Sequence, residues 1–315
     1  MTSRSTAFFM NGGAGRVLSS IPAFEKYHEE HPEDDFIIVC EGGTDFFKGH
    51  PILGKRAFDN WHKQLFEEKI KVRNCVTTEP YRIWEYYNQK CNLSQAFDIQ
   101  INNKGVRNLP KPTLRLTAEE FVHGKSIIED VKEKTKKEKV IIFQPYGRGA
   151  QPLGKAIIDS TGRSFEMADT IKLIKRLQKK YSVVMMSEFK GDYEKMGITE
   201  PLAQPENVPL RIWGGIIRNA DVFLGCDSVG QHLAYALDVP AVVVVGSTFP
   251  ENVSYTDNNK FQVLDVGVGR RVYDPIRVSL DEDANRNNES LMRLNDAVLD
   301  EIMKYVDKMA NKNFK

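Results

Sequence analysis

Short apolar segments alternate with segments of helical periodicity along much of this chain. In the clearest stretch, Val222–Leu224 and Ala241–Val245 are apolar throughout. Between them, Val229–Leu237 has its apolar residues on one helical face. A strand that is apolar on both faces is typical of a parallel sheet covered by helices on both sides. The pattern therefore predicts a strand, a turn at Gly225–Ser228, a helix and a second strand.

The same alternation begins and continues elsewhere, and it predicts two Rossmann-like domains. The first opens with a strand at Ala7–Met10, a glycine-rich turn and a helix at Arg16–His28, then a strand at Phe36–Cys40. The further strands expected in the second are Val140–Phe143, Ser182–Met186 and Phe261–Val266, and its expected helices are Glu166–Lys180 and Leu210–Asn219.

The domain boundary is predicted from one capping box and one charge run. Thr117 and Glu120 form a capping box for a helix that we expect to end near Val131, and Lys132–Lys139 is interpreted as the linker. The expected division is an N-terminal domain at residues 1–135, a second domain at 136–285 and a final segment at 286–315. In that segment Ser290–Lys308 has the pattern of an amphipathic helix.

The composition excludes several classes of protein but does not indicate a function. The chain has 315 residues and a formal net charge of +1, so overall charge points to no partner. It contains no apolar run of membrane-spanning length and no signal-peptide pattern at Met1–Phe9. The four cysteines lack paired metal-binding spacing. We therefore expect a cytoplasmic enzyme that is a monomer or a weak oligomer.

The turn at Asp227 and Ser228 is the first candidate site. It lies between the carboxyl end of a strand and the start of a helix, where backbone N–H groups and the helix dipole favour an anion such as a phosphate. Gly230, in the first helical turn, is expected to let a ligand approach the backbone. The alternative is an ordinary crossover, with Asp227 as a helix cap and His232 packed under the sheet.

The amino-acid sequence of Asp221–Pro250 resembles the donor-site signature of the heptosyltransferase-like glycosyltransferases of family 9. The matching residues are Asp227, Ser228, Gly230, His232, Leu233, Ala234, Ala236, Leu237, Val239 and Pro240, followed by Gly246, Thr248 and Pro250. The resemblance implies a GT-B fold, in which two Rossmann-like domains face across a cleft. It also implies that this turn and helix hold the diphosphate of a nucleotide sugar. By the same resemblance, residues 136–285 form the nucleotide-sugar domain, residues 1–135 form the acceptor domain, and the final helix packs back on the first domain.

The resemblance extends to other loops. In the family, the loop after the Val140–Phe143 strand reaches the donor phosphates through hydroxyls and one basic residue, which points to Tyr146 and to Arg163 or Arg148. Glu188 matches an acidic position that contacts the donor. Gly13 and Gly15 resemble the opening glycine loop of the same family. No placement of that loop satisfies the dinucleotide pattern G-x-G-x-x-G, so a dehydrogenase is only a distant analogue.

One residue departs from the family pattern. Where the family usually carries an aspartate as its supposed catalytic base, this chain has Arg16, which stays protonated and cannot take a proton. Arg16 is therefore expected to bind a phosphate of the donor or the acceptor. Asp45 and Glu41 follow the second strand and are the predicted substitutes for the base.

A basic region suggests the class of the acceptor. Residues 48–125 carry fourteen Lys and Arg against eight Asp and Glu, with interleaved aromatic residues. Such a surface suits a polyanion, and a solvated basic face over an aromatic core is the alternative. The predicted acceptor-binding residues are Arg16, Lys55, Arg56, Lys69, Lys71 and Arg73.

Together these observations predict an inverting glycosyltransferase with a nucleotide-diphosphate sugar as donor and no metal or other cofactor. Asp281-Glu282-Asp283 is interpreted as an exposed acidic turn. The basic region and Arg16 favour duplex DNA carrying hydroxymethylated cytosine as acceptor, as in the glycosyl- and arabinosyltransferases of T-even-like bacteriophages. A lipopolysaccharide-core acceptor, which the family implies, is the alternative. An alternative of another class is a nucleotide-sugar-binding protein without catalysis.

Overall fold

A computed structural model describes residues 5–154, 156–272, 290–312 and 314. The chain divides into two compact units, with the division between Arg115 and Leu116. The boundary expected at residues 135 and 136 therefore differs from the structure by one whole helix.

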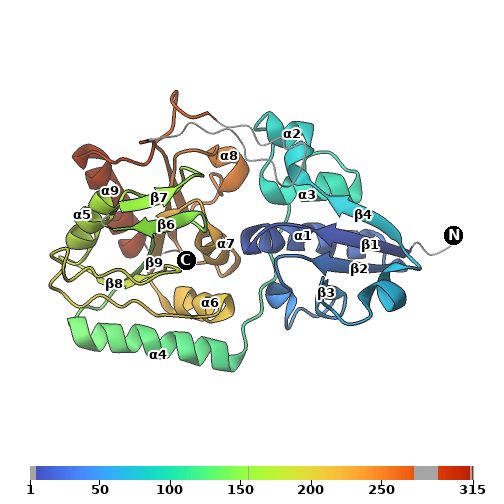
Figure 1. Ribbon diagram of the computed structural model, residues 1–315, viewed down its shortest axis with the longest axis horizontal. Helices are drawn as coiled ribbons and strands as arrows, with labels where there is room; N and C mark the ends of the chain where they lie inside the picture. Colours follow the sequence, from blue (N-terminus) through green and yellow to red (C-terminus); the bar gives the residue numbers. More distant parts are fainter. Residues whose placement is uncertain (1–4, 155, 273–289, 313, 315) are drawn as a thin grey trace. The chain divides into compact units, whose positions relative to one another are not determined.

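Unit 1 is built on a parallel four-stranded sheet in the order β3-β2-β1-β4 (Figure 1). Its strands are β1 Ser5–Met10, β2 Asp35–Cys40, β3 Ala57–Asp59 and β4 Asn74–Thr78. Its helices are α1 Ala14–Glu30, α2 Trp84–Tyr87 and α3 Leu93–Asn102, with short turns at η1 Asp45–Phe47, η2 Leu53–Lys55, η3 Phe66–Ile70 and η4 Pro80–Arg82. The sequence pattern predicted β1, α1 and β2, whereas β3 and β4 are too short and too polar to stand out.

An aromatic cluster holds α1 on this sheet. Phe8 of β1 meets Phe24 and Tyr27 of α1 in edge-to-face contacts, with ring centroids 5.5 and 5.2 Å apart. All three side chains are buried, so their apolar area is removed from water. This packing fixes the glycine-bearing loop between β1 and α1 at the carboxyl edge of the sheet.

Unit 2 is built on a parallel five-stranded sheet in the order β11-β10-β9-β5-β8 (Figure 1). Its strands are β5 Val140–Gln144, β8 Ser182–Met185, β9 Val222–Cys226, β10 Ala241–Val245 and β11 Phe261–Asp265. Its helices are α4 Ala118–Thr135, α5 Met167–Leu177, α6 Leu210–Asn219, α7 Val229–Ala236, α8 Pro250–Val253 and α9 Asp296–Asn311. Strands β5, β8, β9 and β10 are buried at every residue, as expected for a parallel sheet with helices on both faces.

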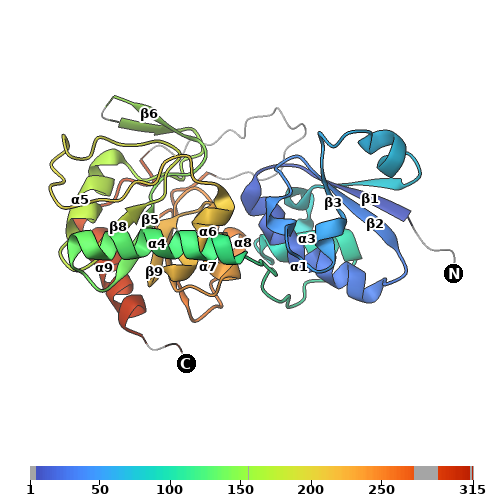
Figure 2. The ribbon, with the colours of Figure 1, turned by 90° about the horizontal axis from the view of Figure 1, so that it is seen from below.

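Helix α4 belongs to unit 2 because its backbone packs directly on α6 (Figure 2). A Cβ atom on Gly124 would lie 2.1 Å from the backbone of Gly215, so only glycine allows this close approach. The Nη2 atom of Arg211 also donates to Glu120 at 2.7 Å. The predicted Thr117–Glu120 capping box is present, but the helix continues to Thr135. Four residues of the expected linker are therefore helical.

The last helix also differs from expectation. Helix α9 begins after Asn295, whose side chain accepts from the N–H of Val298. Leu299, Ile302 and Val306 are fully buried in the core of unit 2, beside α5 and the sheet. The apolar face was correctly identified, but its partner is unit 2, whereas the sequence suggested the first domain.

An antiparallel hairpin of β6 Ala150–Leu153 and β7 Ala156–Asp159, not predicted from the sequence, follows β5 (Figure 2). Asp281-Glu282-Asp283 lies outside the described residues. Among the helices that the structure describes, none has the length and apolar character needed to cross a membrane.

Candidate functional site

Gln144, the last residue of β5, organises the carboxyl edge of the sheet in unit 2. Its side-chain Oε1 accepts from the N–H of Gly230 at 3.0 Å, and its Nε2 donates to Ser228 Oγ at 3.3 Å. Ser228 is the N-cap of α7, and both Ser228 and Val229 remain partly exposed. The amino end of α7 is therefore held by β5 while its first residues stay accessible. Gln144 is a lone polar residue at the end of a buried strand, so the hydrophobic pattern gave no signal of its role.

Gly230 has a different role from the predicted one. A Cβ atom there would lie 2.3 Å from Gln144 Oε1 and 2.5 Å from the buried ring of Phe223. The glycine therefore faces the core, and its missing side chain makes room for Phe223 and Gln144. Its N–H is bonded to Gln144, so we correct the expectation that Gly230 admits a ligand to the backbone.

Asp227 is a buried anchor for the residues around it. Its Oδ1 accepts from Gln231 Nε2 at 2.8 Å, and its Oδ2 accepts from Thr248 Oγ1 at 3.0 Å. The Nη1 atom of Arg163 lies 3.8 Å from the same Oδ2. The two ends of the signature, Asp227 and Thr248, are thus joined through one carboxylate. Asp227 positions Arg163 beside the start of α7.

A second carboxylate, the half-buried Asp159, shapes the loop that carries Arg163. It accepts from the backbone N–H groups and the hydroxyls of both Thr161 and Ser164, at distances of 2.5 to 3.0 Å. Burial would raise the pKa of Asp159, but these hydrogen bonds outweigh it and hold that pKa below its usual value. Arg163 Nε donates to Thr161 Oγ1 at 3.1 Å. Arg148 is exposed in the turn between β5 and β6.

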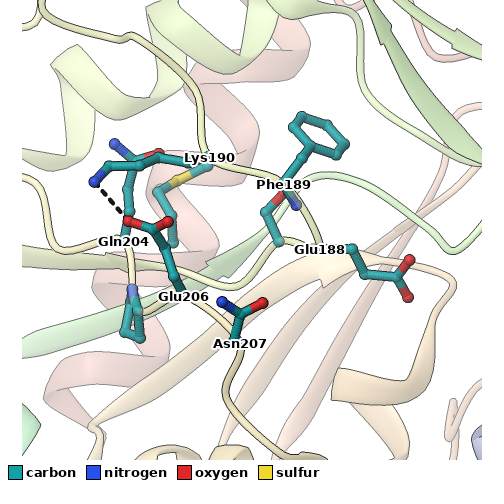
Figure 3. Close-up of a pocket in the computed structure, with 9 residues that line it drawn as sticks. Glu188, Phe189, Lys190, Gln204, Glu206 and Asn207 are labelled. Atoms are coloured by element: carbon teal, nitrogen blue, oxygen red, sulfur yellow. Dashed lines mark hydrogen bonds and ion pairs between the residues drawn. The ribbon is translucent and has the colours of Figure 1, made fainter.

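Two further predicted donor residues in unit 2 are Tyr146 and Glu188. Tyr146 is buried, stacks on Phe189 at 5.2 Å and donates from its hydroxyl to Met167 Sδ at 3.3 Å. It is therefore a core residue, which corrects the expectation for it. Glu188 follows β8 and lines a pocket of about 60 Å³. Its carboxylate points away from the Lys190–Glu206 ion pair on the other side of that pocket (Figure 3).

His232 is a neutral, buried ring. Its Nδ1 lies 2.8 Å from the hydroxyl of Tyr255, which stacks on Tyr235 with centroids 3.6 Å apart. Burial lowers the pKa of His232 to about 4, and the charge of Arg163 contributes further, against the opposing effect of Asp227. The ring is uncharged at neutral pH, so it adds no positive charge for a phosphate.

At the carboxyl edge of unit 1, the glycine loop between β1 and α1 forms a tight turn. Gly12 has a φ of +88°, which favours glycine, and a Cβ on Gly42 would lie 2.2 Å from Gly12 O. Gly13 caps α1 in an extended conformation, and Gly15 lies in the first turn of the helix. Glu41 Oε2 accepts from the N–H of Gly12 at 3.2 Å. The loops after β1 and β2 are therefore joined, as expected for neighbouring parallel strands.

Arg16 points to a carboxylate that the sequence analysis overlooked. Its Nη2 lies 3.4 Å from Oε1 of Glu79, the residue that follows β4, and its guanidinium lies 4.7 Å above the ring of Tyr81. Asn11 Nδ2 also donates to Glu79, at 3.4 Å. The other predicted base, Asp45, is exposed on η1 and lies 2.5 Å from Lys48. The place of Glu79 at a strand end was the signal that could have identified it.

Two of the predicted acceptor-binding residues lie at the opposite edge of the sheet from this loop. Arg56 and Arg73 both pair with Asp35, the first residue of β2, and so lie at the amino edge of the sheet. Arg56 also lies over the ring of Phe36 at 4.5 Å. Lys71 pairs with Glu67 at 2.9 Å, Lys69 lies 5.5 Å from the Phe58 ring, and Lys55 is exposed at the end of η2. Much of this basic charge is therefore compensated within unit 1.

Several solved structures superpose on this chain over nearly its full length. A glycosyl transferase of family 9 from Veillonella parvula superposes with a TM-score of 0.66 at 11% identity, covering 98% of this chain and 97% of that chain. The ADP-heptose heptosyltransferase II of Escherichia coli superposes with a TM-score of 0.54 at 11% identity, covering 97% and 98%. The ADP complex of the E. coli heptosyltransferase WaaC does so with a TM-score of 0.54 at 12% identity, covering 97% and 100%.

In sequence, no protein-family model and no curated protein matches the chain. The likeness therefore rests on the order of the elements and on the two parallel sheets, each with its polar loops at the carboxyl edge. Such an arrangement over nearly the full length is the fold of the family 9 glycosyltransferases, of the GT-B class.

Proposed function

We propose that this protein is an inverting glycosyltransferase that uses a nucleotide-diphosphate sugar. The observation that carries the proposal is the carboxyl edge of unit 2, where Arg163 lies beside the partly exposed start of α7. A helix amino end and an arginine together favour a phosphate group. The buried Asp227 and the half-buried Asp159 hold Arg163 and its loop in place. The fold comparisons support the same activity.

In the proposed reaction, the start of α7 and Arg163 bind the diphosphate of the donor. The acceptor oxygen attacks the anomeric carbon, and the bond from that carbon to the diphosphate breaks with its electron pair leaving on the phosphate. The positive end of the helix and the guanidinium stabilise the charge that develops there. The anomeric carbon passes through an oxocarbenium-like state. Ser228, at the cap of α7, offers a hydroxyl for the same phosphate.

For the acceptor we propose a saccharide hydroxyl in preference to hydroxymethylated DNA. Two observations support this choice. The basic residues that suggested DNA are largely paired with acids, and Arg56 and Arg73 lie at the sheet edge opposite to the glycine loop. The similar structures include heptosyltransferases, and one of them, TibC, was solved in complex with ADP-heptose. The binding screen described next identifies which sugar is transferred.

The test is a calorimetric binding screen with ADP-heptose, UDP-glucose and GDP-mannose, followed by release of the nucleoside diphosphate. We expect one donor to bind and to be turned over with a truncated core oligosaccharide. A donor that binds without turnover would support the non-catalytic alternative. Binding of none of the three would contradict the proposed donor site. Transfer to hydroxymethylated duplex DNA, with strongly salt-dependent binding, would restore the DNA acceptor.

A further inference from the structure

Glu79 occupies a fixed position at the carboxyl edge of unit 1. It follows β4, the neighbour of β1, so its side chain is close to the loop that carries Asn11. Its backbone N–H donates to Gln100 Oε1 of α3 at 2.7 Å, and Pro80 restricts the chain that follows. Its side chain is 17% exposed, which leaves the carboxylate accessible but mostly enclosed.

The partners of Glu79 position its carboxylate but leave part of its hydrogen-bonding capacity unused. Asn11 Nδ2 and Arg16 Nη2 each lie 3.4 Å from one carboxylate oxygen, near the outer limit for a hydrogen bond. Within the described residues, the buried atoms Asn11 Oδ1 and Arg16 Nε have no hydrogen-bond partner. Unsatisfied polar atoms are costly in a folded protein and need a specific reason. A ligand hydroxyl, which both donates and accepts, is chemically suited to this group of atoms.

The two carboxylates predicted as the base are less well placed. Asp45 is 56% exposed and lies 2.5 Å from the ammonium of Lys48 on the same short turn. Glu41 is exposed, and its Oε2 accepts from a backbone N–H of the glycine loop, so that oxygen helps to join the loops after β1 and β2. Glu79 is more enclosed than either of them, and its backbone and its neighbour Arg16 are both held in place.

We propose that Glu79 is the general base of the reaction, and that Arg16 is a positioning residue that orients its carboxylate. This inference rests on the proposed glycosyltransferase function. The acceptor hydroxyl gives its proton to a Glu79 oxygen as its own oxygen bonds to the anomeric carbon. The diphosphate leaves with the electron pair of the broken bond. Arg16, through its contact with Tyr81, keeps the carboxylate directed toward Asn11 and the edge of the sheet.

The first experiment compares the kinetics of Glu79→Gln with those of the wild-type chain. The donor is the nucleotide sugar of the binding screen that the wild type turns over. We expect kcat to fall roughly 10²–10⁴-fold, the usual contribution of a general base, while the donor Kd changes less than about twofold. The matched control is Glu29→Gln, which removes the same charge from an exposed ion pair with Lys26 on α1. Glu41→Gln and Asp45→Asn are measured in parallel.

A second readout separates a base from a structural residue. Azide is a nucleophile that carries no proton, so its attack on the anomeric carbon needs no base. We expect Glu79→Ala to lose transfer to hydroxyl acceptors and to form the glycosyl azide at a rate near that of the wild type. Loss of both reactions in Glu79→Ala would show a structural role and overturn the inference.

The remaining outcomes distinguish the two proposals. Wild-type kcat in Glu79→Gln would overturn the role of Glu79 and leave the glycosyltransferase intact. So would a 10²-fold or larger loss in Glu41→Gln or Asp45→Asn with Glu79→Gln spared. A wild-type chain that binds no donor would overturn the proposed function, and this inference with it.

Discussion

The two units each place an arginine beside a carboxylate at the carboxyl edge of a parallel sheet, but the two pairs differ in how they are held. In unit 2, Asp227 accepts from Gln231 and Thr248 at 2.8 and 3.0 Å, and Arg163 lies further off at 3.8 Å. In unit 1, the described residues that contact the Glu79 carboxylate, Asn11 and Arg16, do so at the longer distance of 3.4 Å. A carboxylate with short, strong hydrogen bonds has a structural role, because it holds its neighbours in place. One with long contacts can exchange them for a substrate.

The glycines show the same difference. Gly230 of unit 2 is required by the core, because Phe223 and Gln144 fill the space where its side chain would be. Gly12 of unit 1 is required by its backbone, whose φ of +88° disfavours other residues. In unit 2, the close packing of Gly230, Phe223 and Gln144 forms a frame that supports the candidate phosphate site. In unit 1, the glycine loop is a tight turn next to Glu79 and Arg16.

The largest expected effect tests the rigid frame of unit 2. Gly230→Leu should destabilise the protein by about 3 kcal/mol, because the new side chain overlaps Phe223 and Gln144. Gly105→Leu is the control, since a Cβ at Gly105 has no atom within 4 Å, and its effect should stay within about 0.5 kcal/mol. Chemical denaturation measures both. Equal stability of the two variants would mean that Gly230 is not part of the frame.

The next effect concerns the buried ring of the same frame. Because the folded pKa of His232 is about 4 and the unfolded value is near 6.5, protons bind the unfolded chain more tightly. The contribution of the ring to stability is therefore complete above about pH 6.5 and is lost as the pH falls toward 4. Between pH 7 and pH 5 we expect a loss of about 2 kcal/mol that is absent in His232→Gln. Identical pH profiles for the two proteins would contradict a buried neutral ring.

The smallest expected effect asks whether the frame serves a ligand. Arg163→Ala should weaken donor binding roughly tenfold, or about 1.4 kcal/mol, through the loss of a charge-assisted contact. Arg148→Ala removes an exposed arginine from the preceding turn and should leave donor affinity unchanged. Calorimetry with the donor identified by the panel measures both. A stronger effect at Arg148 would move the phosphate contact to the β5–β6 turn.

Much of the fold could be predicted from hydrophobic pattern because its buried strands are unusually uniform. β10 contains only alanine and valine and is buried at every residue, so a parallel sheet covered by helices was the expected arrangement. Strands β3 and β4 escaped prediction because they are short and largely exposed at the surface of unit 1. The partner of α9 could not be read from its apolar stripe, which specifies a buried face and no particular neighbour.

The candidate site was predictable where residues are close in sequence. The turn at Asp227 and Ser228 and the nearby Thr248 belong to one crossover, and they come together in the structure. The contacts of Glu79 with Arg16 and of Gln144 with Gly230 span 63 and 86 residues, and sheet order alone brings them together. Tyr146 was misassigned because a position after a strand does not reveal whether the side chain turns inward.

The close contact between α4 and α6 has a consequence for how the chain acquires its structure during synthesis. Arg211 follows Glu120 by 91 residues, so α4 leaves the ribosome long before the helix that fits against Gly124. At the usual rates of translation this interval is roughly 5 to 18 s. Unit 1 can complete its own sheet in that time, whereas α4 remains without its partner. The close fit at Gly124 therefore forms only after the whole chain between the two helices has been made.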